Sequence, residues 1–384
     1  MIAMPERLLL GSGPSPVPPQ ILAAIAQPTV GHLDPAFGEL MEHTVGLLRE
    51  VFLTANPATL PISATGSGGM DALVANFVSP GDRVVCGVNG LFGERMADAL
   101  GRADAEVVRV EAPWGRAIDP SDLVAATRPG LDAMVVVHGE TSTGVCQPLE
   151  GLSAACRERD ALLLVDCVTS LAGQRLAIDE DGVDAAFSGT QKCLNCPPGL
   201  APLTAGPRAL ERLRARRTPV RSWYLDLSLV LAYWVTEASP ADATPAGGSP
   251  PRTYHHTAPI NLIYALHEAL ELVCAEGLPA RWERHRRAHE ALRAALATMG
   301  LERLAPAEHA LAPLLAVKVP DELPEAELRG RLLREHGIEI SGGLGPLAGR
   351  IWRIGVMGVG AQLEPQLRLV RALGSLLGAD AGEA

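Results

Sequence analysis

Three short stretches of the sequence contain residue types that could perform chemistry. Asp166 ends the apolar run LLLVD, and Lys192 follows DAAFSGTQ. Residues 65–73, TGSGGMDAL, place glycines and hydroxyl groups just before a helical pattern. A buried carboxylate needs a partner because an unpaired charge is costly, and a partly desolvated lysine can lose its proton and attack a carbonyl. Free N–H groups at a helix start bind phosphate.

Each stretch also has a purely structural explanation. The TGS motif is typical of a turn and a helix N-cap, Asp166 can cap the turn that follows it, and lysines such as Lys192 are usually exposed. The combination is more specific than its parts. A phosphate cradle, a strand-end acid and a strand-end lysine in one crevice describe a pyridoxal phosphate site. We therefore expect Asp166 and Lys192, which are 26 residues apart, to face the same crevice.

A further candidate for chemistry is the Cys-x-x-Cys pair beside this lysine, formed by Cys193 and Cys196. Such a pair could be a redox disulfide or half of a zinc site. No second Cys-x-x-Cys follows it, and the ten histidines show no ligand spacing with it. We expect both cysteines, like most of the seven, to fill space in a reduced core, and we expect no metal site.

The elements that position these residues are predicted to be alternating helices and strands. Residues 35–53 carry apolar side chains on one helical stripe. Nearly continuous runs of Val, Leu and Ala, typical of strands buried on both faces of a mainly parallel sheet, favour an α/β domain. Ligands of such sheets gather at the carboxyl ends of the strands. The runs lie at residues 83–88, 106–111, 133–139, 161–168 and 184–189.

Beyond about residue 258 the pattern changes to long helices, an apolar run, a further helix and GRIWRIGVMG, which predicts a smaller α+β domain. The predicted division is therefore an N-terminal segment over residues 1–20, a large domain over 21–257 and a small C-terminal domain over 258–384. Residues 237–252, rich in Ala, Pro, Gly and Ser, are expected to form a loop or a flexible insertion.

Size and charge narrow the class of protein. The chain has 384 residues, of which 47% are hydrophobic, enough for a sizeable core. A net charge of −11 argues against a nucleic acid or an anionic membrane as partner. The sequence shows no signal-peptide pattern and no apolar run near the about 20 residues that span a bilayer. We expect a cytoplasmic enzyme that binds neither nucleic acid nor a membrane.

The chain resembles the class V, fold-type I aminotransferases, most closely the alanine–glyoxylate and serine–glyoxylate or serine–pyruvate branch. This resemblance covers nearly the whole chain and implies a large, mainly parallel sheet domain sandwiched by helices, with a smaller C-terminal α+β domain. The motifs that carry it are, in order, LLLGSGPSPVP, GHLDPAF, ISATGSGGMDA, GVNGLFGER, HGETSTGV, LLLVDCVTS, FSGTQKCLNCPPG, YHHTAPI, GGLGP and RIWRIGVMG.

The resemblance also implies roles around a pyridoxal 5′-phosphate cofactor. Lys192 would form the Schiff base, and Asp166 would keep the pyridinium nitrogen protonated. Thr141 would lie near the phenolic oxygen, and the ring would lie between Phe92 and Val168. The phosphate would be held by Thr65, Gly66, Ser67 and Gln191.

A homodimer with shared active sites is implied as well. Tyr254 and Thr257 of the YHHT block would complete the phosphate grip of the partner subunit, and the N-terminal segment would contribute to the substrate site and the dimer. Without the resemblance, His255 and His256 would suggest a metal pair, but adjacent residues of a strand point apart.

Arg353 matches the family arginine that binds the substrate carboxylate, because a guanidinium makes two parallel hydrogen bonds to a carboxylate. Gly13 would leave room only for small side chains, and Ser12 stands where relatives often have proline. The implied reaction is transamination between alanine or serine and glyoxylate or pyruvate, by a ping-pong mechanism through an aldimine and a ketimine.

Other functions remain open at this stage. A cysteine desulfurase-like lyase usually has histidine immediately before the lysine, where this chain has Gln191, and it needs a thiolate on a mobile loop. A 2-aminoethylphosphonate aminotransferase would differ in its donor. A thiol or zinc protein built on Cys193 and Cys196, and a regulatory paralogue without catalysis, are the remaining alternatives.

Overall fold

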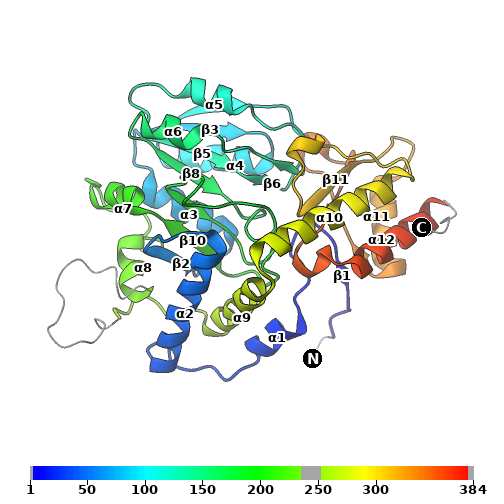
Figure 1. The fold of residues 1–384 in the computed structure, drawn as a ribbon, viewed down its shortest axis with the longest axis horizontal. Coiled ribbons are helices and arrows are strands. Elements are labelled where there is room, and N and C mark those ends of the chain that lie inside the picture. Colours follow the sequence, from blue (N-terminus) through cyan, green and yellow to red (C-terminus); the bar gives the residue numbers. More distant parts are fainter. Residues whose placement is uncertain (1–2, 235–251, 379–384) are drawn as a thin grey trace.

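The computed structural model describes residues 3–234 and 252–378 and divides into a larger and a smaller α/β part (Figure 1). A seven-stranded sheet forms the centre of the larger part. Its β10 runs antiparallel to both of its neighbours, while the remaining pairs are parallel. The strand order is β2 (Ala58–Ile62), β10 (Ala201–Ala205), β9 (Ala185–Phe187), β8 (Leu162–Asp166), β5 (Ala133–Val137), β3 (Arg83–Val88) and β4 (Glu106–Glu111).

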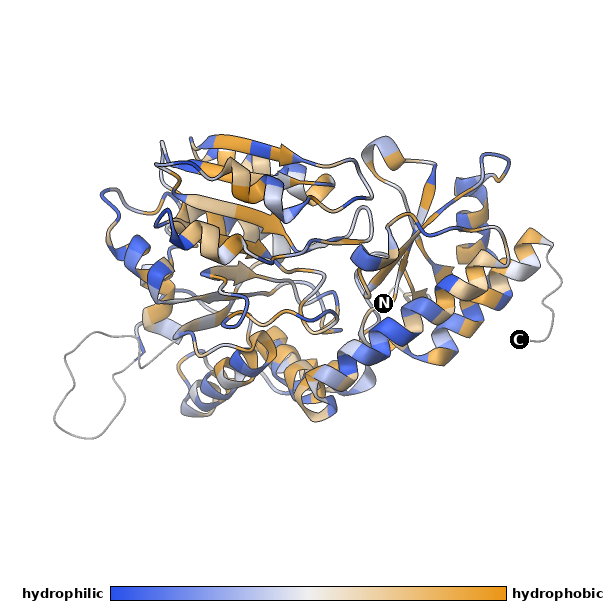
Figure 2. Cartoon of the chain, turned by 45° about the horizontal axis from the view of Figure 1, so that its top comes forward, coloured by the Kyte–Doolittle hydropathy of each residue, from blue (hydrophilic) through white to orange (hydrophobic). Residues whose placement is uncertain are grey.

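This sheet confirms the predicted mainly parallel α/β domain, and five of its strands coincide with the predicted apolar runs. Every residue of β2, β5, β8, β9 and β10 is buried, so these strands are mainly hydrophobic along their length (Figure 2). The edge strand β4 is exposed in alternation instead. The sequence analysis did not predict β2 and β10, whose proline residues interrupt the apolar pattern.

Helices cover the sheet and begin where the local sequence favours it. At the start of α2 (Pro35–Phe52) the Asp34 carboxylate accepts a hydrogen bond from the N–H of Ala36, and proline occupies the first helical position. α3 and α4 contact each other and the sheet, and α5 and α6 contact each other. The other helices are α3 (Gly66–Phe77), α4 (Leu91–Arg102), α5 (Pro120–Ala126), α6 (Leu152–Arg157), α7 (Pro207–Arg214), α8 (Leu227–Trp234) and α9 (Ile260–Glu276).

The smaller part is built on an antiparallel sheet of β11 (Leu314–Lys318), β14 (Ile351–Gly355) and β13 (Ser341–Gly342). The N-terminal strand β1 (Leu8–Leu9) reaches this part and pairs in parallel with β12 (Ile338–Glu339), so the segment after it lies between the two parts of the chain (Figure 1). Three helices pack here: α10 (Leu278–Ala297), α11 (Glu325–His336) and α12 (Leu363–Leu377).

Two hydrophobic cores accompany the two sheets. The first includes most buried residues of α9, such as Leu266 and Leu270, whereas the second begins on α10 with Leu292. The domain limit at residues 257 and 258 stays a prediction, and almost all of the insertion predicted over residues 237–252 lies outside the described residues. Among the helices that the structure describes, none is long and apolar enough to cross a membrane.

Trp352 lies at the centre of the second core with 0% of its surface exposed. We expect Trp352→Ala to lower the free energy of unfolding by about 3–5 kcal/mol, because it removes the largest side chain of that core and leaves a cavity. Leu363→Ala is the control, since Leu363 is 67% exposed and its truncation should change stability by less than about 0.5 kcal/mol. Urea unfolding measures both; equal effects would contradict the prediction.

Candidate active site

A cavity of 220 Å³ lies at the carboxyl ends of the parallel strands. Asp166 is the last residue of β8, and Lys192 follows β9. Both line the same cavity, as the expectation of a shared crevice requires. The other residues that line it are Gly66, Ser67, Met70, Phe92, Arg95, Gly139, Thr141, Val168, Thr169, Phe187 and Gln191.

Asp166 places a carboxyl group in a buried setting. Only 5% of its surface is exposed, and its Oδ1 accepts a hydrogen bond of 2.9 Å from the N–H of Val168. Burial raises the pKa of Asp166 to about 7, the Glu140 carboxylate adds to the rise, and Lys192 opposes it. A cationic group against Asp166 would shift its equilibrium back to the carboxylate, so the site favours a bound cation.

Lys192 is one of only two lysines of the chain, and the other, Lys318, lies exposed at the end of β11. The Nζ atom of Lys192 donates a hydrogen bond to the carbonyl oxygen of Ser12. Burial, followed by the charge of Arg353, lowers the pKa of Lys192 to about 8. A substantial fraction of this amine is therefore neutral just above neutral pH, which is the form that attacks a carbonyl.

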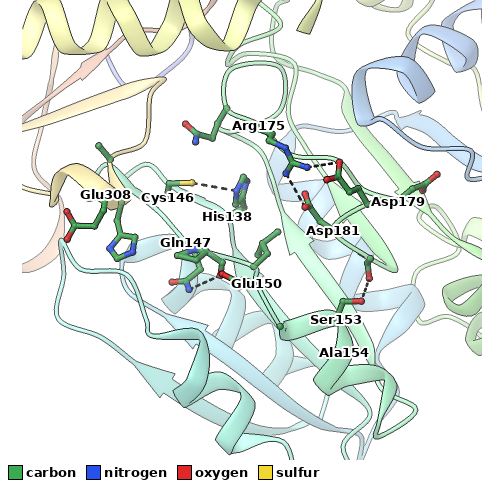
Figure 3. Close-up of a pocket in the computed structure, with 18 of the residues that line it drawn as sticks. His138, Cys146, Gln147, Glu150, Ser153, Ala154, Arg175, Asp179, Asp181 and Glu308 are labelled. Carbon is green, nitrogen blue, oxygen red and sulfur yellow. Dashed lines mark hydrogen bonds and ion pairs between the residues drawn. The ribbon is translucent and has the colours of Figure 1, made fainter. Parts of the chain in front are cut away.

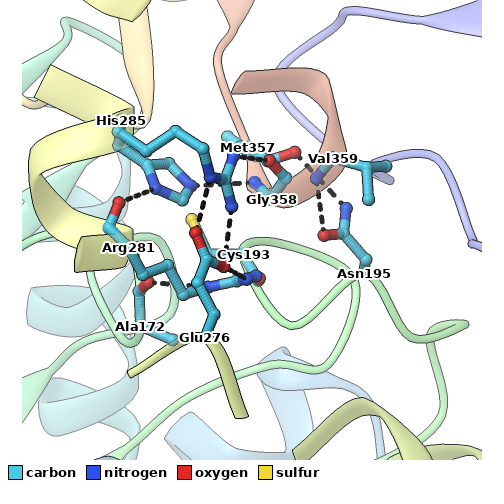
Figure 4. Close-up of polar contacts among 10 residues, drawn as sticks. Ala172, Cys193, Asn195, Glu276, Arg281, His285, Met357, Gly358 and Val359 are labelled. Atoms are coloured by element: carbon cyan, nitrogen blue, oxygen red, sulfur yellow. Dashed lines mark hydrogen bonds and ion pairs between the residues drawn. The ribbon is translucent and has the colours of Figure 1, made fainter. Parts of the chain in front are cut away.

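The loop after Lys192 is anchored to distant parts of the chain (Figure 4). Asn195, at a left-handed φ of 53°, donates its side-chain N–H to Ser15 Oγ and accepts a hydrogen bond of 2.9 Å from the N–H of Val359. Arg281, held by Glu276, donates to the carbonyl oxygens of Ala172 and Cys193. The loop is thus fixed by the N-terminal segment, by α10 and by the segment after β14.

The sequence analysis missed Arg281. That residue lies on a helix in an Arg-rich stretch whose members look alike in sequence. Only its burial, with 6% of its surface exposed, distinguishes it.

Glu140 is a second functional residue that the sequence analysis missed. Its buried carboxylate accepts hydrogen bonds from the N–H groups of Phe92, Gly93 and Ser142 and from the Ser142 hydroxyl. Burial raises the pKa of Glu140. These bonds fix the start of α4 and hence the backbone of Phe92, whose ring faces the cavity under the guanidinium of Arg95, 5.1 Å away.

The predicted phosphate cradle lies at the start of α3. Thr65 is the N-cap residue but makes no capping hydrogen bond with its side chain, so the first N–H groups of the helix lack that partner. Gly66 and Ser67 line the cavity, whereas Thr65 does not. A Cβ on Gly66 would lie 3.5 Å from Val168 and 3.7 Å from Gln191. The Oε1 atom of Gln191 is buried without a hydrogen-bond partner.

Arg353 lies in the middle of β14 and is buried. Its Nε donates to the carbonyl of Gly342 at 2.8 Å and its Nη1 to that of Thr141 at 3.4 Å, which leaves Nη2 unused among these bonds. Burial lowers the pKa of Arg353 to about 10, so it remains a cation at neutral pH. Thr141 also shares a hydrogen bond of 2.5 Å with the hydroxyl of Thr169.

The Gly-Ser-Gly-Pro turn presses against the lysine. At Gly13, whose φ is +107°, a Cβ would lie 2.8 Å from Cδ and 2.9 Å from Nζ of Lys192. Ser12 is held by Ser341, whose Oγ accepts from the N–H of Ser12 at 3.0 Å and lies 3.2 Å from its Oγ. These contacts restrain the turn and join the N-terminal segment to β13.

Tyr254 and Thr257 do not line the cavity of their own chain. Tyr254 is 55% exposed, and its hydroxyl lies 3.5 Å from that of Thr257. The rings of His255 and His256 approach each other, with 2.8 Å between their Nδ1 atoms, and His255 stacks on Trp223. Tyr254 and Thr257 are exposed together with Trp223, which is 62% exposed, whereas His255 is buried with 6% of its surface exposed.

A larger pocket of 1020 Å³ lies outside this site (Figure 3). It is formed by the segments around β7 (Val145–Cys146) and α6, by residues 174–182 and by the 3-10 helix Ala307–His309. His138 and Cys146 meet at its wall, with 3.6 Å between Nε2 and Sγ. Neither Asp166 nor Lys192 lines it, so its size does not make it the reactive site.

The Cys-x-x-Cys pair is buried and reduced. Cys193 and Cys196 are both free thiols with about 1% of their surface exposed. Burial raises the pKa of each to about 12, so both are protonated at neutral pH. A protonated thiol is a weak nucleophile, and both side chains pack in the first hydrophobic core.

Comparison with known proteins decides the family. The family model of the class V aminotransferases matches residues 7–349. The chain belongs to the class V aminotransferases. The enzymes of this family depend on pyridoxal phosphate, and this chain is an aminotransferase that acts on an amino acid and a 2-oxo acid.

Solved structures agree with the family. An alanine–glyoxylate aminotransferase from Nostoc sp. is 46% identical with a TM-score of 0.92, covering 98% of this chain and 96% of that one. The ureidoglycine–glyoxylate aminotransferase of Bacillus subtilis is 37% identical with a TM-score of 0.93, covering 100% and 96%. A cysteine desulfurase from Thermococcus onnurineus, at 14% identity and a TM-score of 0.71, shares the fold alone.

The residues present fit the cofactor. The buried Asp166, which makes no ion pair among the described residues, would hold a pyridinium nitrogen, while the uncapped start of α3 and the Nε2 amide group of Gln191, which lines the cavity, would donate to a phosphate. Lys192 is the lysine that the cavity offers to an aldehyde. These individual roles remain predictions from the family motif, and the geometry of the cavity supports them.

The lowered pKa of Lys192 predicts a pH profile for its reactivity. In protein freed of cofactor, reductive methylation of Lys192 by formaldehyde should rise about tenfold per pH unit and level off above pH 8, because only the neutral amine reacts. Peptide mass spectrometry measures it, with the Lys318 peptide as internal reference. Removing the neighbouring cation in Arg353→Gln should move the midpoint to higher pH. An unmoved midpoint would contradict this electrostatic coupling.

Proposed function

We propose that this enzyme transfers the amino group of a small L-amino acid, alanine or serine, to a small 2-oxo acid, with glyoxylate preferred and pyruvate as an alternative. The observation that carries the proposal is a single cavity lined by both Lys192 and Asp166. Thr141, whose carbonyl oxygen accepts a hydrogen bond from Arg353, lines the same cavity, and the Gly13 turn lies against Lys192. The names of the similar proteins from Nostoc and Bacillus, which share glyoxylate, support the choice of acceptor.

The residues of the chain divide the work of the reaction. When bound, pyridoxal phosphate supplies an electron-withdrawing ring that makes the α-proton of the substrate acidic. Arg353 is a cation whose Nη2 group makes none of the hydrogen bonds described above. It binds the α-carboxylate that the amino acid and the 2-oxo acid share. Lys192 Nζ accepts the α-proton and later returns it as a general acid. Asp166 would stay ionised and would keep the pyridinium nitrogen of the cofactor protonated.

The size of the site limits the substrate. The cavity of 220 Å³ has to hold both the cofactor ring and the substrate, and Gly13 allows no additional side chain beside Lys192. Small donors are therefore favoured. Because one methylene changes binding by only about 1–3 kcal/mol, alanine and serine should be discriminated weakly.

A second candidate donor is (S)-ureidoglycine. It is supported by the transaminase of Bacillus subtilis that bears this name, which is 36% identical over 100% of this chain. The two candidates share the acceptor and differ only in the donor. Initial rates with glyoxylate and each of alanine, serine and (S)-ureidoglycine separate them, and a rate with none of the three would contradict both.

Arg353→Gln tests the carboxylate site. We expect kcat/KM for alanine and for glyoxylate to fall by roughly a hundredfold, mostly through KM, because a charged pair of hydrogen bonds to the carboxylate is lost. Arg350→Gln, on an exposed arginine of the same segment, is the control and should leave both unchanged. Lys192→Ala should instead lower kcat by about a thousandfold or more. Steady-state kinetics in which Arg353→Gln retained normal KM values would contradict the role.

We further propose a homodimer with shared sites. Trp223, Tyr224, Tyr254 and Leu33 are large apolar side chains that lie exposed, and Tyr254 contacts the ring of His32. Exposed residues of this kind are typical of a protein interface. Tyr254 and Thr257, which do not reach the cavity of their own chain, would reach that of the partner.

Complementation tests the sharing of sites. Heterodimers of Lys192→Ala with a chain carrying Tyr254→Ala and Thr257→Ala should regain about half of the wild-type activity, because one of the two sites is then intact. Heterodimers of Lys192→Ala with Arg353→Gln are the control, and their kcat/KM should stay about a hundredfold below that of the wild type, since both residues would serve the site of the same chain. Differently tagged chains are co-expressed and purified. Equal activity of the two heterodimers would refute the shared site.

A further inference from the structure

A group of potential metal ligands lies outside the active site, where helices α2 and α9 pack together. His43 is on α2, and His267 and Glu271 are four residues apart on one face of α9. The His43 Nδ1 and His267 Nε2 atoms are 2.8 Å apart. Glu271 Oε1 lies 3.5 Å from His43 Nδ1 and 3.9 Å from His267 Nε2. The three ligand atoms therefore lie within 4 Å of one another.

These separations suit a zinc ion. Two ligand atoms that lie about 2.0–2.2 Å from a tetrahedral zinc ion are roughly 3.4 Å apart. The three observed separations lie on both sides of that value, so small rotations of the side chains would complete the geometry. Two imidazoles and one carboxylate are also a common ligand set for zinc, and they are less suited to Mg²⁺ or Ca²⁺, which prefer oxygen.

The surroundings favour a cation and hold the ligands in place. Glu268 adds a negative charge next to His267. The two helices are fixed by the first hydrophobic core, in which Leu48 of α2 and Leu270 of α9 are fully buried. The backbone positions of the ligands therefore do not depend on the ion.

We propose that His43, His267 and Glu271 form a zinc site that joins α2 to α9, with the fourth position open to water. The ion would add a link between two helices that the first hydrophobic core already holds together. The simpler explanation of the same contacts is a pair of histidines that share one proton, and the experiment has to separate the two.

Zinc titration of the cofactor-loaded enzyme tests the proposal. Isothermal calorimetry should show that one zinc ion binds per chain at micromolar free zinc. Elemental analysis after desalting should give the same ratio. His43→Ala and Glu271→Gln should each weaken binding by at least about tenfold. Glu268→Gln, which changes a carboxylate on the same helix that is not a ligand, is the matched control and should bind within about threefold of the wild type. Co²⁺ in place of zinc should give visible d–d absorption of a tetrahedral site in the wild type and not in His43→Ala.

The outcomes are distinct from those of the transamination assays, because none of them requires turnover. Zinc should also raise the melting temperature of the wild type and leave that of His43→Ala unchanged. Zinc binding that is equal in the wild type and His43→Ala would overturn the site and favour the shared proton. A ratio of one zinc ion to two chains would overturn a site made by a single chain. Visible cofactor absorbance in every variant confirms that the variants are folded.

Discussion

The buried negative charge at the end of β8 is the constraint on which the active site depends. Asp166 is placed at the carboxyl end of a strand that is buried along its whole length, with one backbone N–H as hydrogen-bond partner. Burial raises the pKa of Asp166 to about 7, so its carboxyl group is only about half ionised at neutral pH. A cation bound against it relieves that cost, and the free energy released contributes to holding the cofactor.

The amine of Lys192 depends on a similar balance between burial and neighbouring charges. Burial and Arg353 destabilise the protonated form of Lys192, while the carboxylates of Asp166 and Glu140 act the other way. The two effects leave an amine that can be neutral or protonated within the working range of pH. A proton-transfer residue needs that property, because it has to accept the proton and give it back.

The site is also the place where the two parts of the chain are joined. The carbonyl oxygen of Ser12 accepts a hydrogen bond from the amine of Lys192. Asn195 connects the lysine loop to the segment after β14, and Arg353 of the small sheet donates a hydrogen bond to the carbonyl of Thr141. A movement of one part against the other would therefore change the setting of both Lys192 and the carboxylate-binding guanidinium. In this fold the packing between the parts and the chemistry share the same hydrogen bonds.

The sequence by itself determined the elements and the reactive pair. Five of the seven strands of the large sheet, the helix that follows the TGSGG stretch and the strand-end positions of Asp166 and Lys192 follow from local patterns, because strand burial is encoded within a few residues; β2 and β10 were missed. The order of the motifs then indicated the family. Tyr254 was assigned to a partner subunit from the family motif, and that assignment stays a prediction.

Tertiary structure decided what depends on long-range contacts. Glu140 and Arg281 are charged residues in unremarkable surroundings along the chain, and only the fold buries them against backbone groups of distant segments. His43 and His267 are separated by 224 positions, so no ligand spacing could reveal them. The pKa values of Asp166 and Lys192 likewise come from burial and from charges brought together by the sheet, since a local sequence fixes which group is present but not how much water surrounds it.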